Sequence, residues 1–158
     1  MNDAVRTQTS VPSVLIVDDS RVNLEIMRQI LSRDYRTFRA YNGQQALDLA
    51  RWYPPDLILL DVEMPGMDGY QVCAILKSDP RTRHIPVIFV TGMVDAESFA
   101  KGSAAGAAGF LTKPVESASV RSQVFIQLRL AHAQGLLAAK CGGGVNPEPP
   151  AGLFRQVA

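Results

Sequence analysis

Five polar residues that could do chemistry together stand at the ends of short apolar runs. They are Asp18, Asp19, Asp61, Thr91 and Lys113. Three carboxylates in one place repel each other and raise one another's pKa values, and a hard divalent cation such as Mg²⁺ relieves that repulsion. A carboxylate beside a metal can also act as a nucleophile towards phosphorus, while a cation and a hydroxyl neutralise charge on the phosphoryl oxygens. The residue types therefore predict Mg²⁺-dependent phosphoryl transfer to an aspartate.

Each of these residues also has a simpler explanation when it is taken alone. An Asp-Asp pair after a strand is commonly a helix cap or a turn, a threonine there is commonly a local cap, and a lysine before a proline is usually solvated. Asp61 alone could be a solvated loop residue or the N-cap of the next helix. The coincidence of the set at four strand ends favours the shared site.

The apolar runs that carry these residues are typical of buried strands in a parallel sheet. The clearest is 57–60, four aliphatic residues that lead into Asp61 and then into a loop broken by Pro65, Gly66 and Gly69. Five strands are expected, each followed by a helix, at 14–17, 36–40, 57–61, 87–90 and 109–112. This alternation predicts a parallel sheet with helices on both faces. Parallel strands end at one edge, so the polar residues should share one crevice.

Two helices have a core face that apolar spacing predicts. In the first helix, which Ser20 should cap, the expected core residues are Val22, Ile26, Met27, Ile30 and Leu31. In the last helix, expected from Ser117 to about residue 139, they are Val120, Val124, Phe125 and Leu128.

The composition is ordinary for a soluble globular protein. Of the 158 residues, 47% are apolar and 20% are charged, and the net charge of +1 argues against a broad nucleic-acid footprint. Cys73 and Cys141 form neither a disulfide framework nor a zinc motif. Residues 1–13 lack the apolar centre of a signal peptide, and no apolar run is long enough to span a bilayer. We therefore expect a cytoplasmic protein with no membrane partner and no direct nucleic-acid partner.

Four stretches of the sequence resemble the receiver domain of two-component response regulators, the CheY-like family. In chain order they are LIVDD at 15–19, LDVEMPGMDG at 60–69, TG at 91–92 and FLTKP at 110–114. Their order and spacing match the family from residue 13 to about residue 128. Several separate motifs in one order make this resemblance specific.

The resemblance implies a flavodoxin-like (βα)5 fold, a doubly wound parallel sheet with strand order 2-1-3-4-5. It also implies that a histidine kinase or a phosphotransfer protein phosphorylates Asp61, and that Thr91 and Lys113 contact the phosphoryl group.

The same resemblance implies a metal site and a switch. Mg²⁺ would be held by Asp19 and Asp61, by Asp18 through water, and by the main-chain oxygen of Glu63. Lys113–Pro114 would be a cis peptide bond. Two residues would form the switch, in which an aromatic ring rotates inward when a hydroxyl is recruited by the phosphate; they are Phe110 and Thr91.

Two other functional classes share this architecture. An aspartate-nucleophile phosphatase would need a general acid and usually a cap region, and no such insertion is visible. A flavin or nucleotide carrier would need Gly, Ser and Thr after the first strand, where Asp18 and Asp19 would instead repel a phosphate. We therefore predict a phosphorylation-controlled switch and not an enzyme with a separate substrate. Its output stays open between a stand-alone regulator and the receiver half of a longer regulator with a cyclic-di-GMP enzyme output.

Composition predicts four segments along the chain. They are a disordered lead-in at 1–12, the receiver domain at 13–130, an extension of the last helix at 131–140 and a flexible Gly/Pro-rich tail at 141–158. The helix extension carries leucines that the domain does not need. We therefore expect a homodimer that phosphorylation strengthens, through this helix and the face around Phe110.

Overall fold

The computed structural model describes residues 11–138, in which strands and helices alternate along the chain. The strands are β1 (Ser13–Val17), β2 (Arg36–Ala40), β3 (Leu57–Asp61), β4 (Val87–Thr91) and β5 (Gly109–Thr112). The helices are α1 (Arg21–Leu31), α2 (Gly43–Trp52), α3 (Gly69–Ser78), α4 (Ala96–Ala104) and α5 (Ser117–Ala138). The predicted succession of elements is confirmed.

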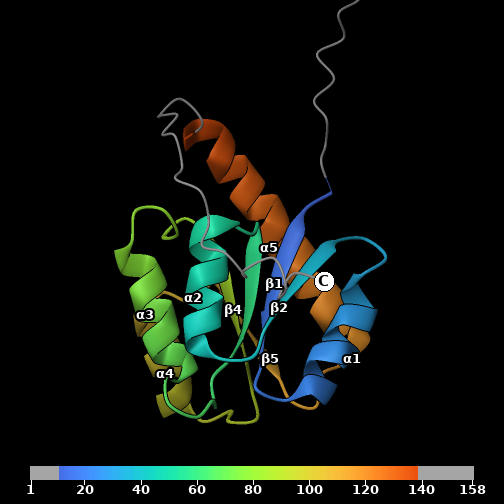
Figure 1. The fold of residues 1–158 in the computed structure, drawn as a ribbon, viewed down its shortest axis with the longest axis vertical. Helices are drawn as coiled ribbons and strands as arrows, with labels where there is room; N and C mark the ends of the chain where they lie inside the picture. The colour runs from blue at the N-terminus through green and yellow to red at the C-terminus, as the bar shows by residue number, and fades with distance from the viewer. Residues whose placement is uncertain (1–10, 139–158) are drawn as a thin grey trace, which may run out of the picture.

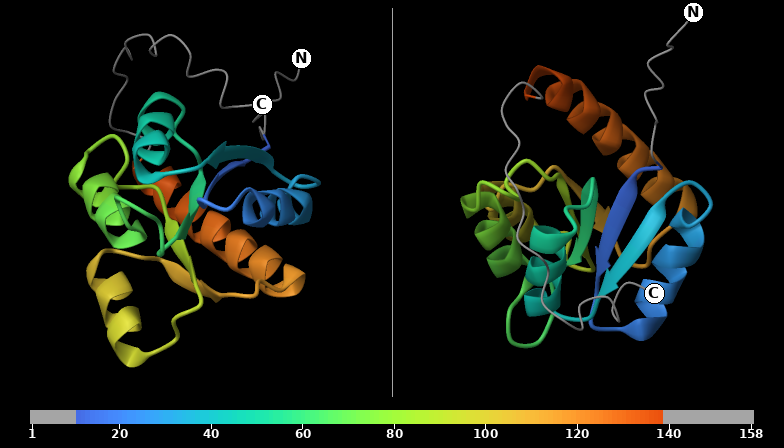
Figure 2. Two further views of the ribbon diagram at one scale, coloured as in Figure 1. Left: turned by 60° about the horizontal axis from the view of Figure 1, so that its bottom comes forward. Right: turned by 45° about the horizontal axis from the view of Figure 1, so that its top comes forward.

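All neighbouring strands pair in parallel, in the order β2-β1-β3-β4-β5. The predicted flavodoxin-like fold class is therefore confirmed. Helices α1 and α5 cover one face of the sheet, and α2, α3 and α4 lie on the other (Figures 1 and 2). The central strand, β3, is buried along its whole length, which explains why its sequence is a continuous aliphatic run.

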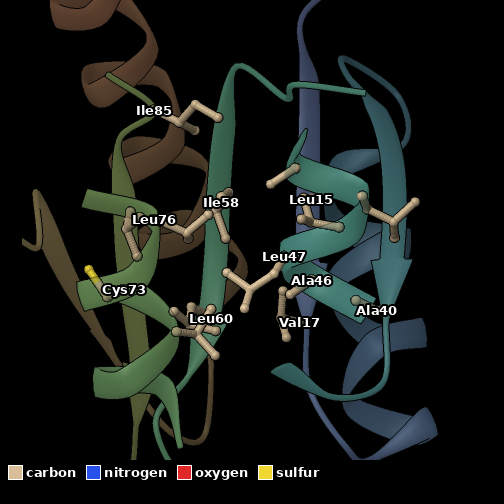
Figure 3. Packing of buried hydrophobic residues seen from close by; sticks show 14 of the residues in the cluster. Leu15, Val17, Ala40, Ala46, Leu47, Ile58, Leu60, Cys73, Leu76 and Ile85 are labelled. Carbon is tan, nitrogen blue, oxygen red and sulfur yellow. The ribbon is translucent and has the colours of Figure 1, made fainter. Parts of the chain in front are cut away.

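The core has two halves because side chains alternate across each strand. Leu15 and Val17 of β1 join Ile58 and Leu60 of β3 in a cluster with α2 and α3 (Figure 3). The intervening strand residues pack with α1 and α5 on the opposite face; they include Val14, Ile16, Leu57 and Leu59. Each half fixes one set of helices against the sheet, and so fixes the loops at the strand ends.

The phase of two helices differs from the prediction. In α1, Val22 and Ile26 are 68% and 43% exposed, and the buried residues are Leu24, Met27, Ile30 and Leu31. In α5, Val120 and Val124 are buried and Leu128 packs partly against them, but Phe125 is 55% exposed. Neighbouring residues on a helix are about 100° apart, so an apolar residue beside the buried row points away from the sheet. The apolar spacing alone did not distinguish the two directions.

The predicted segment boundaries fall partly beyond the described residues. Residues 1–10 and 139–158 lie outside them, and with these go most of the predicted lead-in, the predicted tail and Cys141. Pro12 already contacts the domain, because its carbonyl accepts a hydrogen bond from the amide of Arg36 at 2.9 Å. Across 11–138, no helix combines the length and the apolar character that a membrane span requires.

Candidate functional site

The polar residues singled out above lie at the carboxyl edge of the sheet, the lower edge in Figure 1. Asp18 follows β1, Asp61 ends β3, Thr91 ends β4 and Lys113 follows β5. Strand register brings these ends level, since Asp61 lies opposite Val90 and Thr91 lies opposite Thr112. The parallel topology thus gathers residues from four separate parts of the sequence.

Asp61 is the centre of this edge and is only 2% exposed. Its Oδ1 accepts a hydrogen bond from the main-chain amide of Glu63 at 3.2 Å and lies 3.1 Å from Nζ of Lys113. No other donor among the described residues bonds this carboxylate, so its Oδ2 stays available to a ligand. The side chain of Glu63 is itself exposed.

The loop after β3 is held by its own sequence. Gly66 has a φ of 81°, a conformation that glycine adopts without strain. Asp68 caps α3 in a capping box with Gln71. Gly69 donates its amide to the carbonyl of Val62 at 2.9 Å, and a Cβ on it would overlap the main-chain oxygen of Asp61. Asp68 and Gly69 therefore hold the start of α3 close to the end of β3.

Asp18 is buried and accepts three donors. Its Oδ1 bonds the amide of Ser20 at 2.8 Å, and its Oδ2 bonds Nδ2 of Asn23 at 3.2 Å and Nζ of Lys113 at 3.3 Å. Sequence reasoning missed Asn23. The available signal was its place three residues after the Ser20 N-cap, which puts it on the first turn of α1 facing the end of β1.

Electrostatics at this edge favour a bound cation. Burial raises the pKa of Asp61 to about 6, and the neighbouring Asp18 carboxylate adds to the rise, while Lys113 opposes it. Burial disfavours the charged ammonium of Lys113, but the carboxylates of Asp18 and Asp61 outweigh that effect and raise its pKa. One ammonium therefore does not compensate the carboxylates fully.

Three carboxylates are close enough to share a metal ion. Asp18, Asp19 and Asp61 each offer an oxygen, and these oxygens lie within 4.8 Å of one another. Asp19 is exposed to solvent and the other two are buried. An all-oxygen donor set that is open on one side fits a hard divalent cation.

Thr91 and Phe110 occupy different surroundings. Thr91 is buried, and its Oγ1 accepts the amide of Met93 at 3.0 Å. The half-buried ring of Phe110 stacks on Phe99 of α4 at 4.5 Å between centroids and lies 5.9 Å from the ring of Phe89.

The Lys113–Pro114 peptide bond is cis, and the amide of Lys113 bonds the carbonyl of Thr91 at 2.9 Å.

The family model described as the response regulator receiver domain matches residues 14–125. The chain belongs to this family. Its fold, with strand order 2-1-3-4-5, is that of the CheY-like receivers. Receiver domains are signalling modules that interact with histidine kinases or phosphotransfer proteins.

Three relatives illustrate the range of proteins that this receiver is similar to. A Vibrio cholerae protein named "Probable cyclic di-GMP phosphodiesterase" is 41% identical over 79% of this chain and 28% of its own length. The polar-differentiation response regulator DivK of Brucella anthropi is 41% identical over 65% of this chain and 85% of its own length. The solved receiver domain of a signal transduction histidine kinase from Syntrophus aciditrophicus is 34% identical, covers 86% of this chain and 98% of that one, and gives a TM-score of 0.71.

The relatives differ in what surrounds the receiver. This chain spans about a quarter of the length of the first curated relatives that it matches, 28% of one and 25% of another. It covers most of DivK. The similarity therefore lies in the receiver and not in whatever else those longer proteins contain.

Proposed function

We propose that Asp61 accepts a phosphoryl group from a histidine kinase or a histidine phosphotransfer protein, in a reaction that depends on Mg²⁺. The observation that carries this proposal is the environment of the Asp61 carboxylate. It is 2% exposed at the end of the central strand, paired through Oδ1 with Lys113 and free of donors at Oδ2 among the described residues.

The donor set described above fits Mg²⁺. Asp19 and Asp61 would bind the ion directly, Asp18 through a water, and Glu63 through its main-chain oxygen. Three protein donors already occupy the Asp18 carboxylate, which supports an indirect role for it. The bound ion would neutralise negative charge on the phosphoryl oxygens and on the carboxylates.

The transfer exchanges one bond to phosphorus for another. A carboxylate oxygen of Asp61 forms the new P–O bond while the P–N bond of the donor phosphohistidine breaks. The electron pair of that bond stays on the imidazole nitrogen, which then takes a proton from solvent. Lys113, whose Nζ lies 3.1 Å from Oδ1 of Asp61, would bind one phosphoryl oxygen. The Thr91 hydroxyl accepts a hydrogen bond from Met93, so it would donate its own proton to another phosphoryl oxygen.

An exposed apolar surface on α1, beside the site, is suitable for binding the phosphodonor protein. Val22 and Ile26 are exposed on the first turns of α1, directly after the Asp18 loop. Ile26 also lines a cavity of about 160 Å³ that reaches Asp18 and Lys113. We propose that a helix of the kinase or phosphotransfer protein covers these apolar side chains, which brings its histidine to Asp61.

The proposed output is a change at Thr91 and Phe110. Recruitment of the Thr91 hydroxyl to the phosphoryl group would move the β4–α4 loop and open space for the Phe110 ring to turn inward. The face formed by Phe110, α4 and α5 would then differ between the two states and select a partner or a second copy of the chain.

A receiver within a longer regulator is the second candidate. The Vibrio cholerae relative, of which this chain matches 28%, is named "Probable cyclic di-GMP phosphodiesterase". That name supports an enzyme of cyclic-di-GMP metabolism as the output. In that arrangement the chain itself still only accepts and loses a phosphoryl group, and it has no separate substrate. The full reading frame around residues 1–158 decides between the two.

Mass spectrometry tests the phosphoacceptor. The protein is incubated with acetyl phosphate and Mg²⁺, and its intact mass is measured with time. The wild-type chain should gain one phosphoryl group, the gain should largely vanish in EDTA, and Asp61→Asn should gain none. Equal phosphorylation of Asp61→Asn would assign the reaction to another residue.

A further inference from the structure

The N-terminal half of α4 is weakly attached to the domain. Of the nine residues of α4, all of which the structure describes, only Gly102 is buried, and Phe99 is 59% exposed. A helix that buries so little apolar surface can separate from the domain at a small cost in free energy. The few contacts that hold it therefore decide when it moves.

The C-terminal end of α4 has its own anchor. The Sγ of buried Cys73 lies 3.2 Å from the carbonyl oxygen of Ala105, the C-cap residue that follows α4. Gly106 follows with a φ of 98° and packs against the side chain of Lys77. These contacts come from α3 and involve neither Phe110 nor Thr91, so this end can act as a hinge.

Two kinds of contact involve side chains that bear on the N-terminal half of α4. The first kind depends on Phe110, whose ring stacks on Phe99 and fills the place where a Cβ on Gly102 would lie. The second is a single hydrogen bond, from the hydroxyl of Tyr70 to the main-chain oxygen of Ser98 at 3.3 Å. Phe89 also lies beside Gly102, because its Cδ2 would be 3.1 Å from a Cβ on that glycine. If the Phe110 ring turns inward, the hydrogen bond from Tyr70 is the contact among these that still reaches the N-terminal half of α4.

Tyr70 is firmly placed from the other side. It is the second residue of α3 and follows Gly69, which packs directly on the main chain of Asp61. Its ring meets Phe89 of β4 edge to face at 5.3 Å. One side chain thus connects the backbone that carries Asp61 to the backbone of α4, without passing through Phe110.

We infer that the Tyr70 hydroxyl is a latch that holds the N-terminal half of α4 closed and opposes its release when Asp61 is phosphorylated. Tyr70 is a positioning residue, because it acts on α4 and does not touch the reacting atoms. This inference rests on the proposed function only for the event that releases the latch, the phosphorylation of Asp61. The restraint on α4 exists in the unmodified protein.

Hydrogen exchange tests the restraint itself. Tyr70→Phe keeps the ring on Phe89 and removes the hydroxyl, and Tyr35→Phe on the opposite face of the sheet is the matched control. One lost hydrogen bond should speed amide exchange in peptides covering 94–100 by about three- to ten-fold, with exchange in α1 unchanged. The control should leave both regions as in the wild type. Unchanged exchange at 94–100 in Tyr70→Phe overturns the latch.

Binding of a phosphoryl mimic tests the coupling. Affinity for beryllofluoride in the presence of Mg²⁺ is measured for wild type, Tyr70→Phe and Tyr35→Phe, with Asp61→Asn as the non-binding reference. Loss of the latch should tighten beryllofluoride binding by about three- to ten-fold, and Tyr35→Phe should not. Faster exchange with unaltered affinity would make the hydrogen bond purely structural and overturn the regulatory role. If the wild type binds no beryllofluoride, the proposed function fails, and the exchange experiment still decides the restraint.

Discussion

The ammonium of Lys113 lies 3.1 Å from Oδ1 of Asp61 and 3.3 Å from Oδ2 of Asp18, so one cation is shared between two buried carboxylates. This one ammonium does not compensate both carboxylates, because burial and the neighbouring Asp18 still raise the pKa of Asp61 to about 6. An acid whose pKa is raised on folding stabilises the fold only while it is protonated. The metal-free site is therefore a cost to stability at neutral pH.

Asp61→Asn should stabilise the metal-free protein at pH 7.5 but not at pH 4. The pKa of Asp61 in the folded state, about 6, exceeds its value in the unfolded state. Protonation of Asp61 therefore adds its full contribution to the free energy of unfolding below about pH 4, and this contribution is lost as the pH rises through 6. The gap between variant and wild type should reach on the order of 1 to 3 kcal/mol. Urea unfolding in EDTA across this range measures it, with Asp34→Asn in the turn after α1 as the control. A less stable Asp61→Asn at pH 7.5 would contradict the prediction.

Gly69→Ala should destabilise the fold by about 1 to 3 kcal/mol. A Cβ at this position would meet the main-chain oxygen of Asp61 and lie 2.8 Å from Cα of Val62, and backbone atoms cannot give way as a flexible side chain can. Gly92→Ala is the matched control, because a Cβ there meets nothing within 4 Å. Thermal unfolding of both variants makes the comparison, and equal midpoints would show that the loop after β3 adapts.

The strand ends could be predicted from sequence for a simple physical reason. Aliphatic runs stop where the buried strand stops, and parallel pairing then brings those ends to one edge, so the sequence predicts that Asp18, Asp61 and Lys113 lie close together. The metal and phosphoryl roles of the site residues stay predictions. Two other features were not accessible, the exposure of Val22 and the hydrogen bond of Asn23 to Asp18. Both depend on the rotation of α1 about its own axis relative to the sheet. Apolar residues flank the buried row of this helix on both sides, so the apolar pattern alone does not determine that rotation.

Glu63→Ala should lengthen the lifetime of phosphorylated Asp61 by roughly two- to ten-fold. The Glu63 amide bonds Asp61, and its exposed side chain comes two residues after Asp61. We expect this side chain to border the phosphoryl group and to orient the attacking water. Loss of the phosphoryl mass with time, after removal of the phosphodonor, gives the rate. Glu97→Ala on α4 controls for the loss of one exposed carboxylate. Identical lifetimes for Glu63→Ala and wild type would remove this role.

Phe110 should change its environment when Asp61 carries a phosphoryl mimic. The ring is now fixed by Phe99 and Phe89, and it has no hydroxyl, so an inward position would be stabilised by packing alone. Fluorine NMR of the chain with fluorophenylalanine at position 110 should show a second population with Mg²⁺ and beryllofluoride. Thr91→Ala should reduce that population. A single unshifted resonance in all samples would mean that Phe110 is a core residue in both states.

The last prediction concerns α5, which is apolar on two sides. Val120 and Val124 face the sheet, while Ile126 and Leu130 are 49% and 51% exposed. The helix also extends past the edge of the sheet opposite the candidate site (Figure 1). Such a helix leaves apolar surface in water unless a second partner covers it.

We expect phosphorylation to strengthen a homodimer through this outer face of α5 and the surface around Phe110. Sedimentation should show more dimer with Mg²⁺ and beryllofluoride for the full chain and less for a chain that ends at Arg129. Ile126→Glu is a second test that keeps the full length, because a buried charge at the interface is costly, and Glu116→Gln outside this stripe is its control. If all four chains stay monomeric at high concentration with and without the mimic, α5 is not a dimer element. The switch would then act on a separate partner, since the apolar face of α5 would still have to be covered by something other than a second copy.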